Sequence, residues 1–272
     1  MNGAYLSYKN SSIGYQVYGT GKRVVLCFHG YGESASSFNY LAAAGGQAFT
    51  FIAITLPFHD QTEWKEGLLF TTEDLVLITN RLLQKEGFDS PASLGLLGYS
   101  LGGRMALALY SSDPGKFSRV GLVAPDGLKI NPWYWLVTQT WAGNKFFQFT
   151  MKQPYWLFGF LRFLNRLGWI NASIYKFIHL YIDDKKVRDN LYQRWTALRK
   201  IKPDLKKIKK MIRAHKTAFR LIYGRYDKII LPVRGELFCK DTGEYCSIRI
   251  LETGHQLLQE KYAGEIIDAL LR

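Results

Sequence analysis

The sequence predicts an α/β fold in which a mostly parallel sheet is covered by helices on both faces and carries an inserted helical segment. Three observations lead to this prediction. Apolar runs of strand length alternate with helical patterns on both sides of the insertion, as is typical of a parallel sheet. A Gly-x-Ser-x-Gly motif lies between a predicted strand and a predicted helix. Residues 126–216 differ from the rest of the chain in charge and in aromatic content.

Two short aromatic-rich segments at the start of the chain alternate polar and apolar residues and predict a hairpin. The elements expected before the insertion are hairpin strands over 4–9 and 13–18, strands over 24–28, 48–55, 93–99 and 118–124, and helices over 36–44, 72–86 and 101–112. Leu75, Ile78 and Leu82 recur at helical spacing, and Gly87 is a typical helix stop. The elements expected after the insertion are strands over 217–223 and 245–251 and helices over 232–240 and 257–271.

Residues 126–216 form the predicted insertion, which divides the core into residues 1–125 and 217–272. The insertion holds 19 Lys and Arg against five Asp and Glu, so it accounts for the whole net charge of +14. Six of the seven tryptophans also lie in it. Two amphipathic stripes indicate helices: Trp156, Phe160, Phe163, Leu164, Leu167 and Ile170 form the first, and Ile201, Leu205, Ile208 and Ile212 form the second. We therefore expect a basic, aromatic-rich helical cap after the sixth strand.

The segment from Gly98 to Gly102 reads Gly-Tyr-Ser-Leu-Gly, and Gly103 follows directly. An apolar strand precedes this segment and a helical pattern follows it, so the serine would lie on a sharp turn above the sheet edge. The small flanking residues permit strand and helix to approach closely. This context makes Ser100 the candidate nucleophile, although the motif alone also arises by chance in ordinary turns.

A serine nucleophile needs a general base, and the base needs an orienting acid. Asp227 follows the predicted strand 217–223, and His255 follows the predicted strand 245–251. Open parallel sheets place their sites at the carboxyl ends of the strands, so His255 is the candidate base and Asp227 the candidate acid. Asp126 is an alternative acid because it also follows a strand, although its Pro-Asp-Gly context is typical of a turn.

An oxyanion hole also has candidate donors. The strand over 24–28 is followed by His29, Gly30 and Tyr31, whose loop can supply a backbone N–H group. We expect the amides of Tyr31 and Leu101 to stabilise a developing oxyanion, and each such donor typically contributes about 3 kcal/mol.

The remaining histidines have simpler interpretations. His29 and His59 are expected to donate hydrogen bonds that shape the neighbouring loops. His179 and Asp184 match an acyltransferase-like His-x4-Asp spacing, but this spacing is frequent by chance and falls inside the insertion. His215 is expected to be solvated.

These motifs resemble those of the α/β-hydrolase superfamily, and the layout is similar to its single-domain esterases, lipases and C–C hydrolases with a helical cap. The matching positions are His29, Gly30 and Tyr31 for the oxyanion loop, Ser100 for the nucleophile, Asp227 for the acid and His255 for the base. The family's Leu-Pro-Gly-His-Gly turn is similar to residues 56–60, where Phe58 and Asp60 replace the glycines. The resemblance covers the core and not the insertion. It implies a serine hydrolase that uses no metal and no organic cofactor.

The expected function is hydrolysis of a carboxylic ester through an acyl-enzyme. An aromatic cap favours a small-molecule substrate with a hydrophobic acyl or alkyl group, lipid esters included. Hydrolysis of a C–C bond and cofactor-free acyl transfer on the same scaffold stay open, as does a non-enzymatic protein that binds a lipid or a partner protein. Haloalkane dehalogenase and epoxide hydrolase chemistry is disfavoured, because those relatives have an aspartate where this chain has Ser100.

The cysteine number, the apolar segments and the charge limit where the protein is expected to act and what it is expected to bind. The three cysteines lack metal-ligand spacing, and their odd number argues against a disulfide framework and against a zinc site. The chain start shows no secretory signal pattern, and no segment reaches the ~20 apolar residues of a spanning helix, so we expect a cytoplasmic protein. The basic amphipathic insertion favours peripheral contact with an anionic membrane. Nucleic-acid binding is disfavoured, because no recognisable nucleic-acid-binding motif accompanies the charge.

Overall fold

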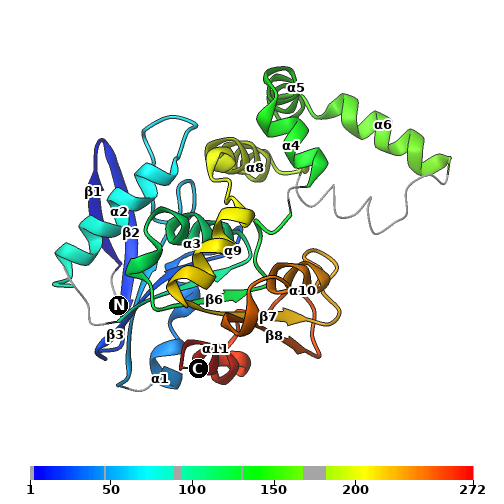
Figure 1. Cartoon of the computed structure of the whole chain (residues 1–272). Helices are drawn as coiled ribbons and strands as arrows, with labels where there is room; N and C mark the ends of the chain where they lie inside the picture. Colours follow the sequence, from blue (N-terminus) through cyan, green and yellow to red (C-terminus); the bar gives the residue numbers. More distant parts are fainter. Residues whose placement is uncertain (1–2, 46, 89–92, 130, 168–181, 272) are drawn as a thin grey trace. The chain divides into compact units, whose positions relative to one another are not determined.

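The computed structural model describes residues 3–45, 47–88, 93–129, 131–167 and 182–271. The chain divides into two compact units. The sheet unit comprises Met1–Glu66, Phe70–Lys129 and Lys200–Arg272, and the helical unit comprises Gly67–Leu69 and Ile130–Arg199. The elements of both units are labelled in Figure 1.

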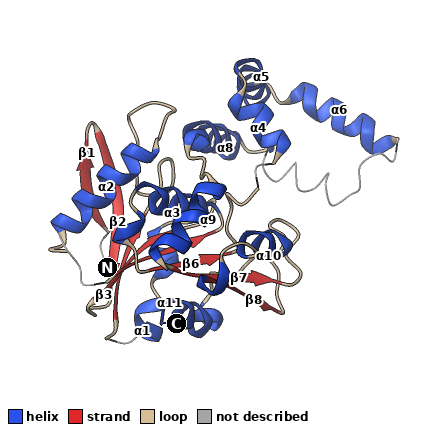
Figure 2. Ribbon diagram, viewed as in Figure 1, coloured by secondary structure: helices blue, strands red, loops and turns tan. Residues whose placement is uncertain are grey.

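The described residues form one eight-stranded sheet in the order β1-β2-β4-β3-β5-β6-β7-β8, drawn in red in Figure 2. The strands are β1 (Ala4–Tyr8), β2 (Ser11–Tyr18), β3 (Arg23–Phe28), β4 (Phe49–Ile54), β5 (Leu94–Tyr99), β6 (Arg119–Val123), β7 (Ala218–Gly224) and β8 (Cys246–Leu251). β2 pairs antiparallel with β1 and with β4, whereas every later neighbour in the sheet is parallel. The carboxyl ends of β3 to β8 therefore share one edge of the sheet.

Helices cover both faces of the sheet, as Figure 1 shows. On one face lie α1 (Leu41–Gly45) and α11 (Ala263–Leu271), and on the other lie α2 (Thr72–Lys85), α3 (Leu101–Ser112) and α9 (Leu205–His215). α10 (Val233–Cys239) packs against β8. Every residue of β4 and β5 is buried, which explains why these strands read as continuous apolar runs rather than as alternating ones.

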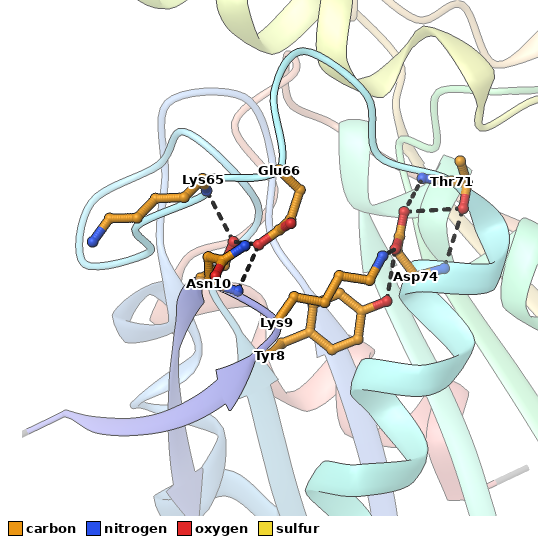
Figure 3. A network of polar contacts seen from close by, with 8 residues as sticks. Tyr8, Lys9, Asn10, Lys65, Glu66, Thr71 and Asp74 are labelled. Carbon is orange, nitrogen blue, oxygen red and sulfur yellow. Dashed lines mark hydrogen bonds and ion pairs between the residues drawn. The ribbon is translucent and has the colours of Figure 1, made fainter.

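A polar network ties the N-terminal hairpin to α2 (Figure 3). The Tyr8 hydroxyl and the Lys9 ammonium donate to Asp74 Oδ1 at 2.6 and 2.7 Å. Asp74 also forms a capping box with Thr71, the residue before the helix. Burial alone would raise the pKa of Asp74, but the hydrogen bonds from Lys9, Tyr8 and Thr71 hold it below its ordinary value. The start of α2 is thus fixed by its own capping residues and by the hairpin.

The predicted elements of the core are confirmed, with small shifts at their ends. Two of the predicted helices are shorter than expected. Residues 36–44 form a 3-10 turn over Ala35–Phe38 and then the short helix α1. Residues 257–271 enter a 3-10 turn over Glu260–Tyr262 before α11 begins.

The helical unit contains α4 (Pro132–Gln139), α5 (Trp141–Lys152), α6 (Tyr155–Arg166) and α8 (Lys185–Ala197) among its described residues. α4, α5 and α8 pack together, and a small core holds the buried side chains of Phe147, Met151 and Ile182. Three of these helices begin at side-chain caps, which are Asn131, Thr140 and Asp184.

The first predicted stripe lies on the exposed face of α6. Trp156, Phe160, Phe163 and Leu167 are exposed and Leu164 is half-buried, whereas Leu161, which is not part of the stripe, is buried. Ile170 lies outside the described residues. The helical period of the pattern is therefore confirmed, but this face packs little against the rest of the helical unit.

The second stripe has a different partner from the one expected. Leu205, Ile208 and Ile212 lie on α9, which belongs to the sheet unit and packs against α3, and Ile201 precedes this helix. Ile208 and Ile212 are fully buried there. The helical unit accordingly ends at Arg199 and not at residue 216. Its role as a cap stays a prediction.

A disulfide joins Cys239, at the end of α10, to Cys246, at the start of β8. The odd number of cysteines argued against a disulfide framework, but this pair forms one bridge, while Cys27 is free and buried. An odd count argues against full pairing but leaves room for a single bridge across a short loop. Among the described residues, the structure contains no helix with the length and apolar character needed to cross a bilayer.

Candidate active site

Ser100 occupies a strained turn between β5 and α3. Its backbone has φ +48° and ψ −115°, a left-handed conformation that typically costs ~1–3 kcal/mol outside glycine. Three backbone hydrogen bonds hold the turn: Ser100 N–H donates to Val123 O at 2.9 Å, and Ser100 O accepts from Gly103 at 2.9 Å and from Asp126 at 2.8 Å. The strain is thus maintained by the end of β6 and by the first turn of α3.

Two glycines of the motif are required by close backbone approach. A Cβ atom on Gly98 would lie 2.5 Å from the Gly102 carbonyl oxygen. A Cβ atom on Gly102 would overlap the carbonyl group of Phe28 at the end of β3. Strand and helix therefore meet backbone to backbone below Ser100, as the sequence predicted.

The structure brings Ser100, His255 and Asp227 into one hydrogen-bonded chain. His255 Nε2 lies 3.1 Å from Ser100 Oγ, and His255 Nδ1 lies 2.7 Å from Asp227 Oδ2. The three residues follow β5, β8 and β7 respectively, so they meet at the carboxyl edge of the sheet. All three belong to the sheet unit.

The second carboxylate oxygen of Asp227 accepts N–H groups from Ile229 and Ile230 at 2.8 and 2.9 Å. Burial alone would raise the pKa of Asp227, but the hydrogen bonds from His255, Ile230 and Ile229 hold it below its ordinary value. An ionised carboxylate accepts only, so His255 Nδ1 carries the proton and donates it. That tautomer leaves Nε2 as an acceptor facing the Ser100 hydroxyl.

The alternative acid, Asp126, is engaged elsewhere. Its carboxylate forms an ion pair with Arg104 on α3, and it also accepts the N–H of Gly127 at 2.6 Å. His255 therefore receives its carboxylate partner from Asp227, in agreement with the order of preference drawn from the sequence.

The loop after β3 is held by a buried histidine. The Leu56 N–H donates to His29 Nε2 at 3.0 Å, so His29 Nδ1 carries the proton and donates to the Gly30 carbonyl oxygen at 2.7 Å. The expected structural role of His29 is confirmed. Tyr31 follows on this loop, and Leu101 begins α3, where the first N–H groups have no acceptor within the helix. The pairing of these two amides as an oxyanion hole stays a prediction.

Two residues that the sequence did not single out also shape the site. Glu33 Oε2 accepts the Gly30 N–H at 3.2 Å. Burial raises the pKa of Glu33, although the hydrogen bond from Gly30 and the nearby His255 oppose this rise. The Tyr99 hydroxyl donates to the His255 carbonyl oxygen at 3.1 Å, and its ring lies against Gly30. Tyr99 thus connects the loop of Gly30 with that of His255, and its place inside the serine motif was the available signal.

The turn over residues 56–60 has left-handed backbone at Phe58 and Asp60, the two positions where the similar turn of the family has glycine. Phe58 has φ +62° and Asp60 has φ +34°, so both adopt the left-handed region that glycine accepts most readily. His59 between them is buried, and its Nδ1 lies 2.9 Å from the Pro57 carbonyl oxygen. The expected structural role of His59 is therefore confirmed.

The other sequence candidates contribute nothing to this site. His215 is exposed, as expected. Asp184 caps α8, and its proposed partner His179 lies outside the described residues. The described part of the chain contains no group of three or more histidine, cysteine, aspartate or glutamate side chains arranged to hold a metal ion.

Comparison with known proteins identifies the family of the chain. The sequence profile of the Alpha/beta hydrolase family matches residues 24–269. The chain belongs to this family and is a hydrolase. A relative from Bacillus subtilis (strain 168), named an uncharacterized hydrolase, YugF, is 27% identical over 107 residues. That match spans 39% of this chain and 38% of the relative, so it covers well under half of either protein.

Solved α/β hydrolase structures share the fold over nearly the whole chain. A carboxylesterase of Nitrososphaera gargenis has a TM-score of 0.67 at 17% identity, covering 98% of this chain and 96% of its own. A putative lipase of Acinetobacter baumannii AYE has a TM-score of 0.64 at 19% identity, covering 99% and 90%. The enol-lactonase of Burkholderia xenovorans LB400 has a TM-score of 0.63 at 16% identity, covering 99% and 100%. At these identities the likeness shows the fold alone.

Proposed function

We propose that this hydrolase cleaves a carboxylic ester, with Ser100 as nucleophile, His255 as general base and Asp227 as orienting acid. The observation that carries the proposal is the chain of two hydrogen bonds, from the Asp227 carboxylate through the His255 imidazole to the Ser100 hydroxyl. It supplies a general base, fixes the tautomer of that base and brings the base to the serine hydroxyl. Structural neighbours described as a carboxylesterase, a lipase and an enol-lactonase are consistent with an ester substrate.

The reaction would proceed in two halves. His255 Nε2 takes the hydroxyl proton while Ser100 Oγ forms a bond to the ester carbonyl carbon, and the carbonyl oxygen becomes an oxyanion. The amides of Tyr31 and Leu101, the latter at the positive end of α3, would stabilise this charge. His255 then gives its proton to the leaving alcohol, and an acyl-enzyme remains. Water, deprotonated by His255, releases the acid and restores Ser100.

A hydrophobic acyl or alkyl group is the substrate class that we favour. The helical unit, which we propose acts as the cap, carries many aromatic side chains on its described helices. Aromatic side chains remove large apolar areas from water and suit a substrate of the same character. Lipid esters are the natural extension of this class.

A series of p-nitrophenyl esters from acetate to palmitate tests this proposal, with the native protein and Ser100→Ala side by side. We expect activity that peaks at one chain length and falls about 10⁴-fold or more in the variant. A fluorophosphonate probe should label the native serine and not the variant. Labelling without esterase activity would favour C–C hydrolysis or acyl transfer. Failure of both assays in folded protein would favour a binding protein and overturn the proposal.

We propose in addition that the helical unit binds the surface of an anionic bilayer. Large apolar side chains are exposed on three of its helices, namely Trp133, Trp135, Leu136, Trp141, Phe146, Phe149, Tyr155, Phe160 and Phe163. Residues 130–199 hold ten Lys and Arg against three Asp and Glu, so the charge of this segment complements acidic lipid. Aromatic rings beside basic side chains suit the headgroup region of a bilayer.

Cosedimentation with vesicles tests the membrane proposal. We expect the protein to pellet with vesicles that contain phosphatidylserine, less at high salt, and not with pure phosphatidylcholine. The double variant Trp141→Ser and Phe163→Ser should bind about tenfold or more weakly. Leu77→Ser, at an exposed apolar position on α2 of the sheet unit, is the control and should bind as the native protein does. Absence of pelleting, or equal pelleting of the double variant, would overturn the proposal.

A further inference from the structure

The amino ends of the parallel strands carry a cluster of arginines. Arg23 begins β3, Arg119 begins β6 and Arg220 lies near the start of β7. The parallel register pairs Val25 with Gly95 and Gly95 with Arg119. Paired residues of neighbouring strands share a face, and side chains two residues apart on one strand do as well. Arg23, Arg119 and Arg220 therefore lie on one face of the sheet, at the end opposite Ser100.

A cavity of about 270 Å³ opens at this cluster. Its lining includes Arg23, Ser93, Gly95, Ser118, Arg119 and Leu270. Gly95, on β5 between β3 and β6, has no side chain to fill the cavity. The hydroxyl oxygens of Ser93 and Ser118 lie 3.0 Å from each other. The cavity is large enough for a group of several heavy atoms, and hydroxyl and guanidinium groups line it together.

Arg119 is the residue that most needs a ligand. Its Nη1 atom is buried and has no hydrogen-bond partner. Burial lowers the pKa of Arg119, and the neighbouring cations Arg220 and Arg23 lower it further. Asp268, on the helix that covers this face, forms an ion pair with Arg249 at 3.2 Å. A buried donor without an acceptor is unfavourable, and neighbouring positive charges add to the penalty.

We propose that this cavity binds a phosphate group, either free or carried by a small phosphomonoester. A guanidinium group presents paired N–H donors that match phosphate oxygens, and two arginines, Arg23 and Arg119, line the cavity. Arg220 does not line the cavity and donates to the carbonyl oxygens of Phe219 and Tyr245, but its positive charge adds to the attraction for the negative charge of a phosphate. The bound oxygen atoms would supply Arg119 Nη1 with the acceptor that it lacks. The site is separate from the proposed active site and does not depend on it, because none of its lining residues belongs to the serine motif or to the loops of Asp227 and His255.

Thermal unfolding of the full chain during titration with inorganic phosphate tests the proposal. The ionic strength is held constant with sodium chloride, and glycerol phosphate and acetate are titrated in parallel. We expect a saturable rise in Tm with inorganic phosphate and none with acetate. A larger rise with glycerol phosphate would identify a phosphomonoester as the source of the group. A rise with acetate as large as that with phosphate, or no rise with either phosphate, would overturn the proposal.

Variants separate a specific site from general charge effects. Arg119→Met should weaken phosphate binding about tenfold or more, since it removes a charged hydrogen-bond donor. It should also raise the Tm in the absence of phosphate, because it removes an unpaired buried donor, whereas a purely structural arginine would give a lower Tm. Arg23→Met, at an exposed position, should weaken binding about fivefold and guards against misfolding of the first variant. Arg234→Met on α10 is the matched control. Equal phosphate affinity in Arg119→Met and in the native protein would overturn the proposal.

Discussion

The two units differ in how far their large aromatic side chains are exposed to solvent. In the sheet unit the largest side chains, such as Tyr15, Tyr110 and Tyr223, are almost completely buried. In the helical unit Trp133 and Trp141 are 73% and 79% exposed. The sheet unit buries many large aromatic side chains in its core, whereas the helical unit leaves several large apolar side chains exposed. The difference shows that the aromatic content of a segment does not by itself predict whether its aromatic side chains are buried or exposed.

The units also differ in what their polar groups do. The described acids and histidines of the sheet unit include several with fixed partners, as in the pairs Asp74 with Lys9, Asp126 with Arg104 and Asp227 with His255. The described acids of the helical unit are few, and Asp184 serves as a helix cap. Chemistry is therefore expected from the sheet unit and recognition from the helical unit. Substitutions in each unit test this division.

The largest expected effect is that of Asp227→Asn on the proposed catalysis. The new amide donates where the carboxylate accepted, so His255 would carry its proton on Nε2 and could no longer accept the Ser100 proton. We expect kcat to fall about 10⁴-fold with the fold intact. Asp126→Asn is the matched control and should reduce kcat less than tenfold, because its backbone bond to Ser100 is kept. A larger loss in Asp126→Asn than in Asp227→Asn would reverse the assignment of the acid.

Asp227 is also expected to make the stability of the sheet unit depend on pH. Its pKa in the folded protein is lowered, so its ionised form stabilises the fold above its unfolded pKa of about 3.9. This contribution is lost as the pH falls through the folded pKa. Acid unfolding followed by circular dichroism should therefore show a weaker loss of stability below pH ~4 in Asp227→Asn than in the native protein. Identical acid limbs would contradict the stabilising role of the ionised Asp227.

Replacement of one aromatic residue from each unit compares burial directly. Phe219 on β7 is fully buried, so Phe219→Ala should lower the free energy of unfolding by about 3–5 kcal/mol. Trp141 is highly exposed, so Trp141→Ala should change it by less than about 0.5 kcal/mol. Urea unfolding of both variants measures the difference. A loss in Trp141→Ala as large as that in Phe219→Ala would mean that the helical surface is a covered core.

Sequence reasoning was strongest where local pattern and chemistry agree. The strand, glycine-containing turn and helix around Ser100 are encoded within a few adjacent residues, so these elements could be predicted. That Ser100 is a nucleophile stays a prediction. That Asp227 and His255 each follow a strand could be read from the sequence, whereas the hydrogen bonds of His255 with Ser100 and Asp227 are seen only in the structure. The sequence ranked Asp227 ahead of Asp126, and the structure adds that Asp126 forms an ion pair with Arg104 of α3.

The sequence did not predict the packing where an apolar helix face could be covered by more than one part of the molecule. The stripes on α6 and α9 have the same period, yet α9 packs against the sheet unit and the α6 stripe is exposed. Periodicity identifies an apolar face but not what covers it. The Cys239–Cys246 bridge was not predicted, because an odd number of cysteines does not exclude a single bridge that closes a short loop. Arg119 and Arg220 belong to no sequence motif, and the register of the sheet places them on the same face as Arg23.

The smallest expected effect is that of a substitution at Glu33. This carboxyl group accepts the Gly30 N–H and interacts electrostatically with His255. Burial raises the pKa of Glu33 in the folded protein, so its neutral form is favoured there relative to the unfolded chain. Stability from this group is present below the unfolded pKa of about 4.3 and is lost as the pH rises through the folded pKa. Glu33→Gln keeps an acceptor for the Gly30 N–H and should raise the Tm at pH 7 by about 2 °C. The exposed Glu244→Gln is the control, and an unchanged or lower Tm in Glu33→Gln alone would show that the ionised carboxylate is required in the loop.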